Sequence, residues 1–298
     1  MIYKEKIIVT GAGGLIGNEL CNLLDKHKLP FIAIYRTEPQ LMNNWNKEFL
    51  NLESSNSVNH PCWNNASCVI HCAASIPSEK TSIDTCYTIN KQIDLNVFNA
   101  IKKNSIPMLI FLSTSSIYGF SKDEIFEDSE PSPQNLYSLG KLQSESLFRS
   151  ITNCRTIFLR INAPYHPKQS LNTVLKIFIE NAINNNDLVF HGSGLRAQDF
   201  TAVDDIVNAI FSIISQGIKT SGEVYNVASG KPISMRDLAK LIVSIIPNTA
   251  SKITPSGIDD PQENCRSIFN INKFSNEYHW KPKVNLKQGI GAWFQQIK

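Results

Sequence analysis

The sequence predicts an α/β protein built on a doubly wound parallel sheet. The first observation is a glycine-rich turn that follows the apolar run Ile7–Val9 and precedes a helical pattern of leucines: Thr10-Gly11-Ala12-Gly13-Gly14-Leu15-Ile16-Gly17. The second observation is the alternation of short β-branched runs with amphipathic segments through the first half of the chain. Repeated strand–helix units pack as a parallel sheet with helices on both faces, and ligands then bind outside the carboxyl ends of the strands.

The glycines of this turn have three different physical tasks. Gly11 can adopt the tight turn, Gly14 lets the backbone approach a pyrophosphate, and Gly17 lets the helix pack closely on the strand. The helix that follows presents unpaired N–H groups and the positive end of its dipole to the same place. The pattern is typical of the first turn of a dinucleotide-binding fold.

The remaining elements of the first half follow in order. We expect strands at Ile7–Val9, Phe31–Ile34, Val69–His71, Leu109–Leu112 and Thr156–Arg160, and helices over Asn18–Leu24, Asn90–Lys103 and Tyr137–Ser150. The polar, asparagine-rich stretch Glu38–Asn65 is expected to be a loosely patterned connection.

After Asn162 the pattern changes to scattered helices with short strands between them. We expect helices over Thr173–Asn184, Asp204–Ser215 and Ser234–Ile246, and strands at Leu188–His191 and Val224–Val227. Acidic residues open the second of these helices, and Ser234 is suited to cap the third. The strand at 224–227 is expected to return to the sheet.

Composition excludes several classes of protein. The chain has 298 residues, of which 42% are hydrophobic and 18% charged, and a net charge of only +3, with no basic run that contains aromatic residues. The small net charge gives no reason to expect a nucleic-acid partner. No apolar stretch reaches the length of a membrane span, so no membrane partner is expected either. Because the first strand is expected within the first ten residues of this sequence, no signal peptide is expected. Seven cysteines without a CxxC pair are expected to be reduced thiols of a cytoplasmic protein, and no metal site is expected.

A second motif, Tyr137-Ser138-Leu139-Gly140-Lys141, places a phenol and an ammonium four residues apart. On a helix this spacing puts both groups on one face. A nearby ammonium favours the phenolate, so Lys141 is expected to lower the pKa of Tyr137 from about 10 toward the range of a general acid or base. Upstream, a strand pattern ends in hydroxyl side chains, Ser113 to Ser116.

These motifs together resemble the extended short-chain dehydrogenase/reductase superfamily, in its NAD-dependent epimerase/dehydratase family. Further similarities run along the whole chain: Val69-Ile70-His71-Cys72-Ala73-Ala74, Leu159-Arg160-Ile161-Asn162-Ala163-Pro164, Asp199-Phe200 with Val203-Asp204-Asp205, Val224-Tyr225-Asn226-Val227, and Trp280-Lys281-Pro282. The resemblance implies a Rossmann-type domain over residues 1–161, to which 200–228 return. It also implies that residues 162–298 form mainly a small lobe that closes over a substrate.

The resemblance also implies the catalytic residues. Tyr137 would be the general acid or base, Lys141 would support it and bind the cofactor ribose, and Thr114 would hold the substrate oxygen. His71, like the other histidines, is expected to be structural. The expected cofactor-binding residues are Gly11, Gly14, Leu15, Ile16, Gly17, Arg36, Ala73, Ala74, Ser113, Tyr137 and Lys141.

The choice of cofactor depends on the end of the second strand. A carboxylate there would accept a hydrogen bond from the adenosine ribose and indicate NAD. The chain has Arg36 instead and no acid before Glu38. Because a guanidinium pairs well with a phosphate, NADP(H) is favoured and NAD(H) is the alternative.

Substrate recognition departs from the family pattern. Sugar-nucleotide 4,6-dehydratases of this superfamily carry Asp-Glu after the active-site threonine, whereas this chain has Ser115 and Ser116, so elimination of water is not expected. The family's arginine before Asp-Phe is replaced by Gln198. The candidate substrate contacts are Ser115, Ser116, Arg160, Asn162, Arg196 and Arg266, and the arginines suit a nucleotide-diphosphate sugar.

The leading hypothesis is an NADP-dependent reductase of a 4-keto group on a nucleotide-linked deoxysugar, in cell-surface polysaccharide synthesis. A sugar-nucleotide 4-epimerase with tightly bound NAD is the main alternative, because it would use the same groups. A reductase of non-sugar ketones and a non-catalytic dinucleotide sensor are further alternatives. Relatives dimerise through two helices per subunit, which predicts a homodimer formed by 90–103 and 137–150.

Overall fold

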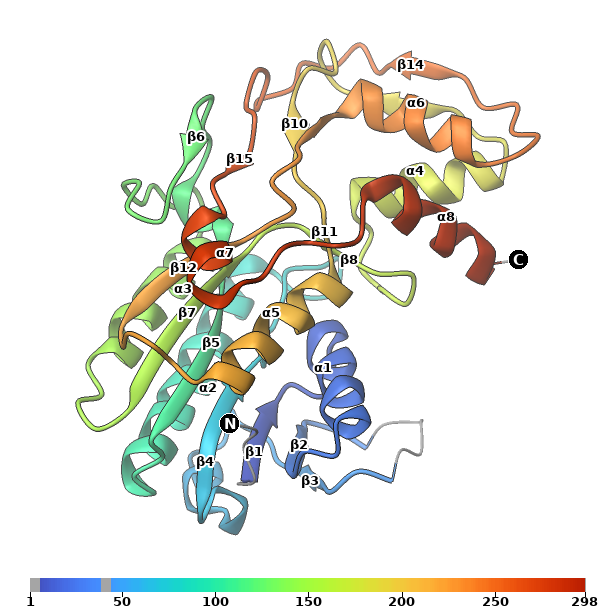
Figure 1. The fold of residues 1–298 in the computed structure, drawn as a ribbon. Helices are drawn as coiled ribbons and strands as arrows, with labels where there is room; N and C mark the ends of the chain where they lie inside the picture. Colours follow the sequence, from blue (N-terminus) through green and yellow to red (C-terminus); the bar gives the residue numbers. More distant parts are fainter. Residues whose placement is uncertain (1–5, 39–43, 298) are drawn as a thin grey trace.

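A computed structural model of the chain describes residues 6–38 and 44–297, and its centre is a parallel sheet (Figure 1). Within these residues the sheet has seven strands in the order β12-β7-β5-β4-β1-β2-β3, every neighbouring pair parallel. The strands are β1 (Lys6–Thr10), β2 (Phe31–Tyr35), β3 (Lys47–Phe49), β4 (Ala66–His71), β5 (Met108–Thr114), β7 (Arg155–Ile161) and β12 (Glu223–Val227). The expected doubly wound parallel sheet is confirmed, as is the return of 224–227 to it.

Helices cover both faces of the sheet, because successive side chains of a strand point to opposite sides. Ile7 and Val9 pack into a core with α1 (Leu15–Lys26), α5 (Val203–Gln216) and α7 (Asn272–Tyr278). Ile8 packs on the other side with α2 (Ile83–Lys103) and α3 (Leu136–Arg149).

The chain reverses its direction across the sheet between β1 and β4. From β1 it proceeds to β2 and β3 on one side, and then crosses back to β4, β5, β7 and β12 on the other. Such a switch point leaves a crevice at the carboxyl ends of the two central strands. The glycine turn follows β1 at this crevice, and Cys72 to Ala74 follow β4.

The connection expected over Glu38–Asn65 is more ordered than its composition predicts. Residues 39–43 lie outside the described part, but the rest contains β3, which pairs with β2, and two 3₁₀ helices, η1 (Ser55–Asn59) and η2 (Pro61–Trp63). Trp63 is fully buried, and its indole N–H donates to the Ser57 carbonyl at 2.8 Å. Leu52, Cys62 and Trp63 are buried, so apolar side chains anchor a segment whose overall composition is polar.

The second half builds a separate apolar cluster at the upper right of Figure 1. It contains α4 (Val174–Ile183), α6 (Met235–Ile245) and α8 (Leu286–Ile297), with β9 (Leu188–Phe190) paired to β14 (Ile253–Pro255). Ser234 caps α6 as expected, since its side chain accepts a hydrogen bond from the Asp237 N–H. Helices α7 and α8 were not expected. We call this part of the molecule the lobe.

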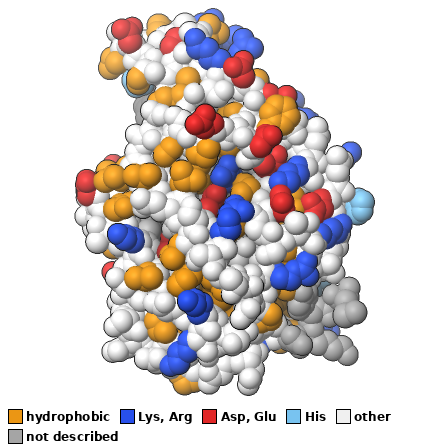
Figure 2. Space-filling model, turned by 90° about the vertical axis from the view of Figure 1, so that its left-hand side faces the viewer, with side chains coloured by type: hydrophobic (Ala, Val, Ile, Leu, Met, Phe, Trp, Pro, Cys, Tyr) orange, Lys and Arg blue, Asp and Glu red, His pale blue; other side chains and the backbone are white. Residues whose placement is uncertain are grey.

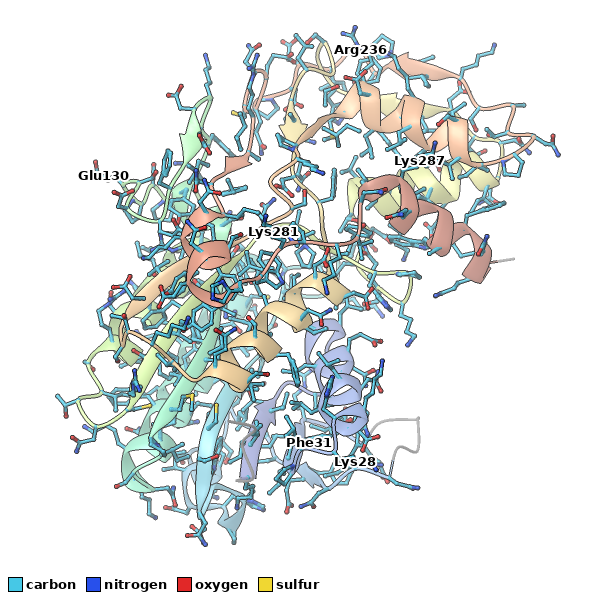
Figure 3. All side chains as sticks on the ribbon, in the orientation of Figure 1. Lys28, Phe31, Glu130, Arg236, Lys281 and Lys287 are labelled. Carbon is cyan, nitrogen blue, oxygen red and sulfur yellow. The ribbon has the colours of Figure 1, made fainter. Side chains whose placement is uncertain are left out.

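Short strand pairs and one extended segment join the lobe to the sheet. The pairs are β8 (Pro164–Tyr165) with β11 (Thr201–Ala202), β10 (Ala197–Gln198) with β13 (Ile233–Ser234), and β6 (Glu124–Ile125) with β15 (Ile268–Phe269). The segment between α7 and α8 crosses from the sheet to the lobe, and Figure 3 labels Lys281 on it. Asp205 at the start of α5 holds this segment by accepting the N–H groups of Lys283 and Val284 at 2.8 and 3.0 Å.

The surface carries charges of both signs. On the face shown in Figure 2, acidic and basic side chains are interspersed among hydrophobic ones. Among the described helices, none combines the length and the hydropathy that crossing a membrane requires.

Candidate active site

The glycine turn fits its expected task at two positions that exclude a side chain. Gly11 has φ +68°, and a Cβ there would lie 2.7 Å from the backbone of Ala73. A Cβ at Gly17 would lie 2.2 Å from the Gly11 carbonyl oxygen. Gly14 precedes α1 at the N-cap, where no side chain caps the helix. The first amides of α1, including those of Leu15 and Ile16, are therefore not capped by a side chain and suit the pyrophosphate of a dinucleotide.

A line of buried hydrogen bonds runs behind this turn. The Thr10 hydroxyl lies 2.6 Å from His71 Nδ1 and accepts the Ala73 N–H at 3.3 Å. His71 Nε2 lies 2.9 Å from Asp94 Oδ1, and the Ser144 hydroxyl donates to the other oxygen of Asp94. His71 is therefore structural, as expected, but it also joins the glycine turn to helices α2 and α3.

Helix α3 carries the Tyr-x-x-x-Lys pair. A reciprocal capping box between Asn135 and Ser138 starts the helix at Leu136. Lys141 is buried, its ammonium donates to the Leu112 carbonyl at 3.0 Å, and it lies over the Phe111 ring. Burial lowers the pKa of Lys141.

Tyr137 behaves differently from the expectation. Its hydroxyl makes no hydrogen bond with the described residues, and burial, followed by the charge of Asp94, raises the pKa of Tyr137 to about 12. The expected lowering by Lys141 is not found, because burial and the neighbouring Asp94 and Cys86 all favour the neutral phenol. Tyr137 is therefore a phenol at neutral pH in this structure.

The hydroxyl side chains after β5 point in different directions. Thr114 and Ser116 bond to each other, with 2.8 Å between their oxygens, and Ser116 is exposed. Ser115 is buried at the start of the 3₁₀ helix η3 (Ser115–Tyr118) and donates to Asn162 Oδ1 at 2.8 Å. Asn162 donates in turn to the Asp199 carbonyl at 2.5 Å. Ser115 and Asn162 therefore satisfy each other inside the protein.

Ser113 and Arg160 belong to a buried ion pair. Arg160 donates through two nitrogens to the Glu145 carboxylate at 3.0 and 2.8 Å, and Ser113 donates to the same carboxylate at 2.6 Å. Arg160 is 5% exposed, so its charge is already paired. A contact between Arg160 and the substrate stays a prediction, and it would require the guanidinium to leave or share Glu145.

Arg36 lies just beyond β2 and is exposed. Its guanidinium is 3.6 Å from a Glu53 oxygen, and 68% of its side-chain surface is accessible. Sequence reasoning did not find Glu53, because 17 residues separate the two partners in a segment without a pattern.

The two expected arginines of the lobe lie apart from the sheet edge. Arg196 pairs with Asp260 at 3.1 Å, and its Nη1 lies 3.3 Å from the Gln262 oxygen. Arg266 is exposed and lines a shallow hollow of about 380 Å³ with Lys122, Leu195 and Asn264. Two cations in one hollow suit an anionic group.

The fold, the turn and the helix together define a dinucleotide-binding oxidoreductase fold of the short-chain type. The profile of the NAD dependent epimerase/dehydratase family matches residues 7–228. The chain belongs to this family.

Relatives of known activity span the whole chain. The dTDP-4-dehydro-6-deoxyglucose reductase of Escherichia coli is 27% identical over 317 residues, covering 99% of this chain and 98% of its own. The dTDP-D-glucose 4,6-dehydratase of Mus musculus is 25% identical and covers 97% and 87%.

Solved structures agree in fold. The UDP-glucose 4-epimerase of Thermotoga maritima, with UDP-glucose, superposes with a TM-score of 0.85 at 21% identity over 98% of both chains. MoeE5 in complex with UDP-glucuronic acid and NAD superposes with a TM-score of 0.86 at 21% identity, over 98% of this chain and 100% of its own. The Rossmann-type fold expected from the sequence is confirmed.

Proposed function

We propose that the protein is an NADPH-dependent reductase of a 4-keto group on a nucleotide-linked deoxysugar. The observation that carries the proposal is the pairing of Tyr137 and Lys141, one turn apart on α3, with hydroxyl side chains from Thr114 to Ser116 where a dehydratase has an acid pair. Reduction of a ketone needs a proton donor at the new alkoxide, and the phenol of Tyr137 is such a donor. The full-length similarity to a 4-keto-deoxysugar reductase supports the same reaction.

Each side chain of the candidate site has a separate role in the proposed reduction. A bound nicotinamide cofactor supplies the hydride. Thr114 holds the ketone oxygen, Tyr137 gives its proton to that oxygen, and the Lys141 ammonium stabilises the phenolate left behind. The glycine turn at Gly11, Gly14 and Gly17 binds the pyrophosphate of the cofactor.

Elimination of water is not part of the proposal. A dehydratase needs an acid and a base beside the substrate ring, and the chain has Ser115 and Ser116 at those positions. Ser115 is buried against Asn162, and Ser116 bonds to Thr114. Neither hydroxyl can take the place of the carboxyl groups that move protons in the elimination of water.

The proposed cofactor is NADP(H), with Arg36 as the partner of the 2′-phosphate. Arg36 lies at the end of β2 and is exposed, so a phosphate can reach it. Glu53 would have to exchange its contact with Arg36 for water, which costs little for an exposed ion pair.

Glu53 also favours a second candidate, a sugar-nucleotide 4-epimerase with tightly bound NAD. A carboxylate at this edge can accept a hydrogen bond from a ribose hydroxyl. An epimerase begins by removing a proton from the sugar, which requires the phenolate of Tyr137. In a reductase the same side chain starts as the phenol and gives its proton to the substrate.

Two measurements separate the candidates. Mass spectrometry of any ligand released from freshly purified protein is combined with calorimetric titration of NADPH and NADH. We expect protein without bound NAD, preference for NADPH, and NADPH oxidation only with a 4-keto-sugar nucleotide. Stoichiometric bound NAD with interconversion of UDP-sugars and no net redox change would replace the reductase by the epimerase. Turnover of simple ketones alone would indicate a non-sugar reductase, and cofactor binding without any turnover a dinucleotide sensor.

The proposal also covers the cellular location, the substrate-binding part and the oligomeric state of the protein. We propose a cytoplasmic enzyme of cell-surface polysaccharide synthesis, with residues 162–298 forming mainly the substrate-binding part and Arg196 and Arg266 contacting the nucleotide diphosphate. We also propose a homodimer through α2 and α3, where Leu95 is an exposed apolar side chain. Light scattering tests the dimer: the expected mass is twice the 33.4 kDa of one chain, and the mass of one chain would contradict it.

A further inference from the structure

A neutral His71 ring fixes the direction of the hydrogen bonds from Thr10 to Asp94. The Asp94 carboxylate can only accept, so His71 Nε2 carries the imidazole proton and donates it to Asp94. Nδ1 then accepts the proton of the Thr10 hydroxyl, whose oxygen in turn accepts the Ala73 N–H. Burial lowers the pKa of His71 despite the nearby carboxylate, which agrees with a neutral ring.

Asp94 is an anion in this arrangement. Its side chain is 1% exposed, and burial alone would raise its pKa. Hydrogen bonds from His71 and Ser144 and the charge of Lys141 outweigh burial, so the pKa of Asp94 lies below its ordinary value. His71 Nε2 donates to one carboxylate oxygen, and the Ser144 hydroxyl shares its proton between the other oxygen and the Gly140 carbonyl at 2.9 Å.

The charge of Asp94 acts on the two groups of the proposed reaction. Burial lowers the pKa of Lys141, and Asp94 opposes this effect ahead of Cys72 and Glu145. The geometry places the carboxylate beside both groups: Ser144, which donates to Asp94, lies on α3 three residues after Lys141 and seven after Tyr137, so the three side chains share one face of the helix. Lys141 itself donates to the Leu112 carbonyl.

The same charge reaches Tyr137. Burial raises the pKa of Tyr137, and Asp94 adds to this effect, followed by Cys86. One carboxylate on α2 therefore stabilises both the charged ammonium and the neutral phenol on α3.

We propose that Asp94 is a positioning residue whose buried carboxylate, oriented by His71 and Ser144, is the counter-charge that keeps Lys141 protonated and Tyr137 in its phenol form. Glu145 is no substitute, because its carboxylate is shared by Arg160 and Ser113. Thr10, the residue directly before Gly11, belongs to the same line of hydrogen bonds, so the glycine turn and helix α3 share one buried support.

The test is Asp94→Asn, which removes the charge but keeps the shape and hydrogen-bonding capacity. Carbon-13 NMR of labelled lysine follows Lys141, whose signal is assigned with Lys141→Met. We expect the Lys141 titration midpoint to fall by about one unit or more, the size typical of a lost neighbouring charge. The matched control is Ser144→Ala, which removes a hydrogen bond to the carboxylate but leaves its charge, and should leave the midpoint nearly unchanged.

Two outcomes overturn the proposal. One is an unchanged Lys141 midpoint in a folded Asp94→Asn protein. The other is a protonated Asp94 at neutral pH in the unaltered chain, read from its carboxyl carbon. The second measurement needs no variant, so the proposal stays testable if Asp94→Asn does not fold.

The effect of Asp94 on catalysis rests on the proposed function. With a 4-keto-sugar nucleotide, the alkaline limb of the rate profile of Asp94→Asn should move to lower pH by about one unit, because the phenol ionises more readily. The NMR readouts need no substrate, so they can succeed even where no keto-sugar is reduced, and the two failures are distinguishable.

Discussion

The sheet side and the lobe side of the candidate site are held together by different kinds of contact. On the sheet side, Thr10, His71 and Asp94 are at most 1% exposed, and each polar atom of their line has a partner. On the lobe side, Arg196 is 26% exposed and Arg266 faces a hollow. The buried side keeps its geometry whatever binds, whereas exposed ion pairs contribute about 0–1 kcal/mol and can exchange partners. For the proposed function we therefore expect cofactor binding on the buried side and substrate selection on the exposed one.

The largest expected effect lies at the proton donor on the rigid side. Tyr137→Phe should reduce turnover by about 10²–10⁴-fold, because no other described group replaces its proton, while cofactor affinity changes little. NADPH oxidation with a 4-keto-sugar nucleotide and calorimetry measure the two quantities. The control is Tyr87→Phe, which removes a phenol that bonds Gln143. An active Tyr137→Phe enzyme would remove the tyrosine from its role.

The next prediction tests the close approach between the glycine turn after β1 and the chain that follows β4. Gly11→Ala places a Cβ 2.7 Å from the Ala73 backbone at φ +68°, so the turn must open. Affinity for the dinucleotide should fall at least about tenfold, or about 1.4 kcal/mol. Gly13→Ala is the matched control, since its Cβ would only touch the Tyr35 ring at 3.4 Å. Equal losses of affinity in the two variants would show that the close approach of Gly11 to Ala73 does not determine dinucleotide binding.

A smaller effect is expected where the rigid side meets solvent. Arg36→Ala should weaken NADPH binding about tenfold and NADH binding much less, because only NADPH carries the 2′-phosphate. Calorimetric titration with both cofactors measures the difference, with Lys26→Ala as the control for loss of one positive charge. Equal losses of affinity for NADPH and NADH would show that Arg36 does not bind the 2′-phosphate.

The smallest effect is a dependence of stability on pH. The pKa of His71 is lowered in the folded chain, so the unfolded chain binds a proton that the folded chain does not. The free energy of unfolding should be constant with respect to this group above about pH 6.5 and fall below it, by about 1 kcal/mol for each unit while the ring stays neutral. Urea titrations at several pH values measure this slope. His71→Asn should flatten it, and an identical slope in that variant would assign it to other groups.

The sequence predicted the parts of the molecule whose patterns are local. The glycine turn and α1 depend on neighbouring residues, and the alternation of strands and helices gave the sheet. By contrast, β3 has three residues without an apolar pattern, and it forms because β2 offers it an edge. Helix α7 is short, and Phe274 is buried among residues that lie far away in the sequence.

The same distinction holds for the candidate site. Tyr137 and Lys141 share a helix, so their proximity followed from spacing alone. The partner of His71 is Asp94, the partner of Arg160 is Glu145, and these pairs meet only after the sheet has formed. The direction of the Tyr137 pKa was wrong for the same reason, because the dehydration of the phenol is a property of packing and not of spacing.

The position of α7 also affects how the protein is made. Phe274, Tyr278 and Trp280 complete the core that β1 and α1 begin, although some 250 residues of chain lie between them. During synthesis the first strands and helices leave the ribosome long before their last packing partners. Helix α5 covers the α1 side of that core earlier, and the part against α5 and β12 is the last to be covered, by α7. The nascent chain therefore passes through a stage in which this core is incomplete.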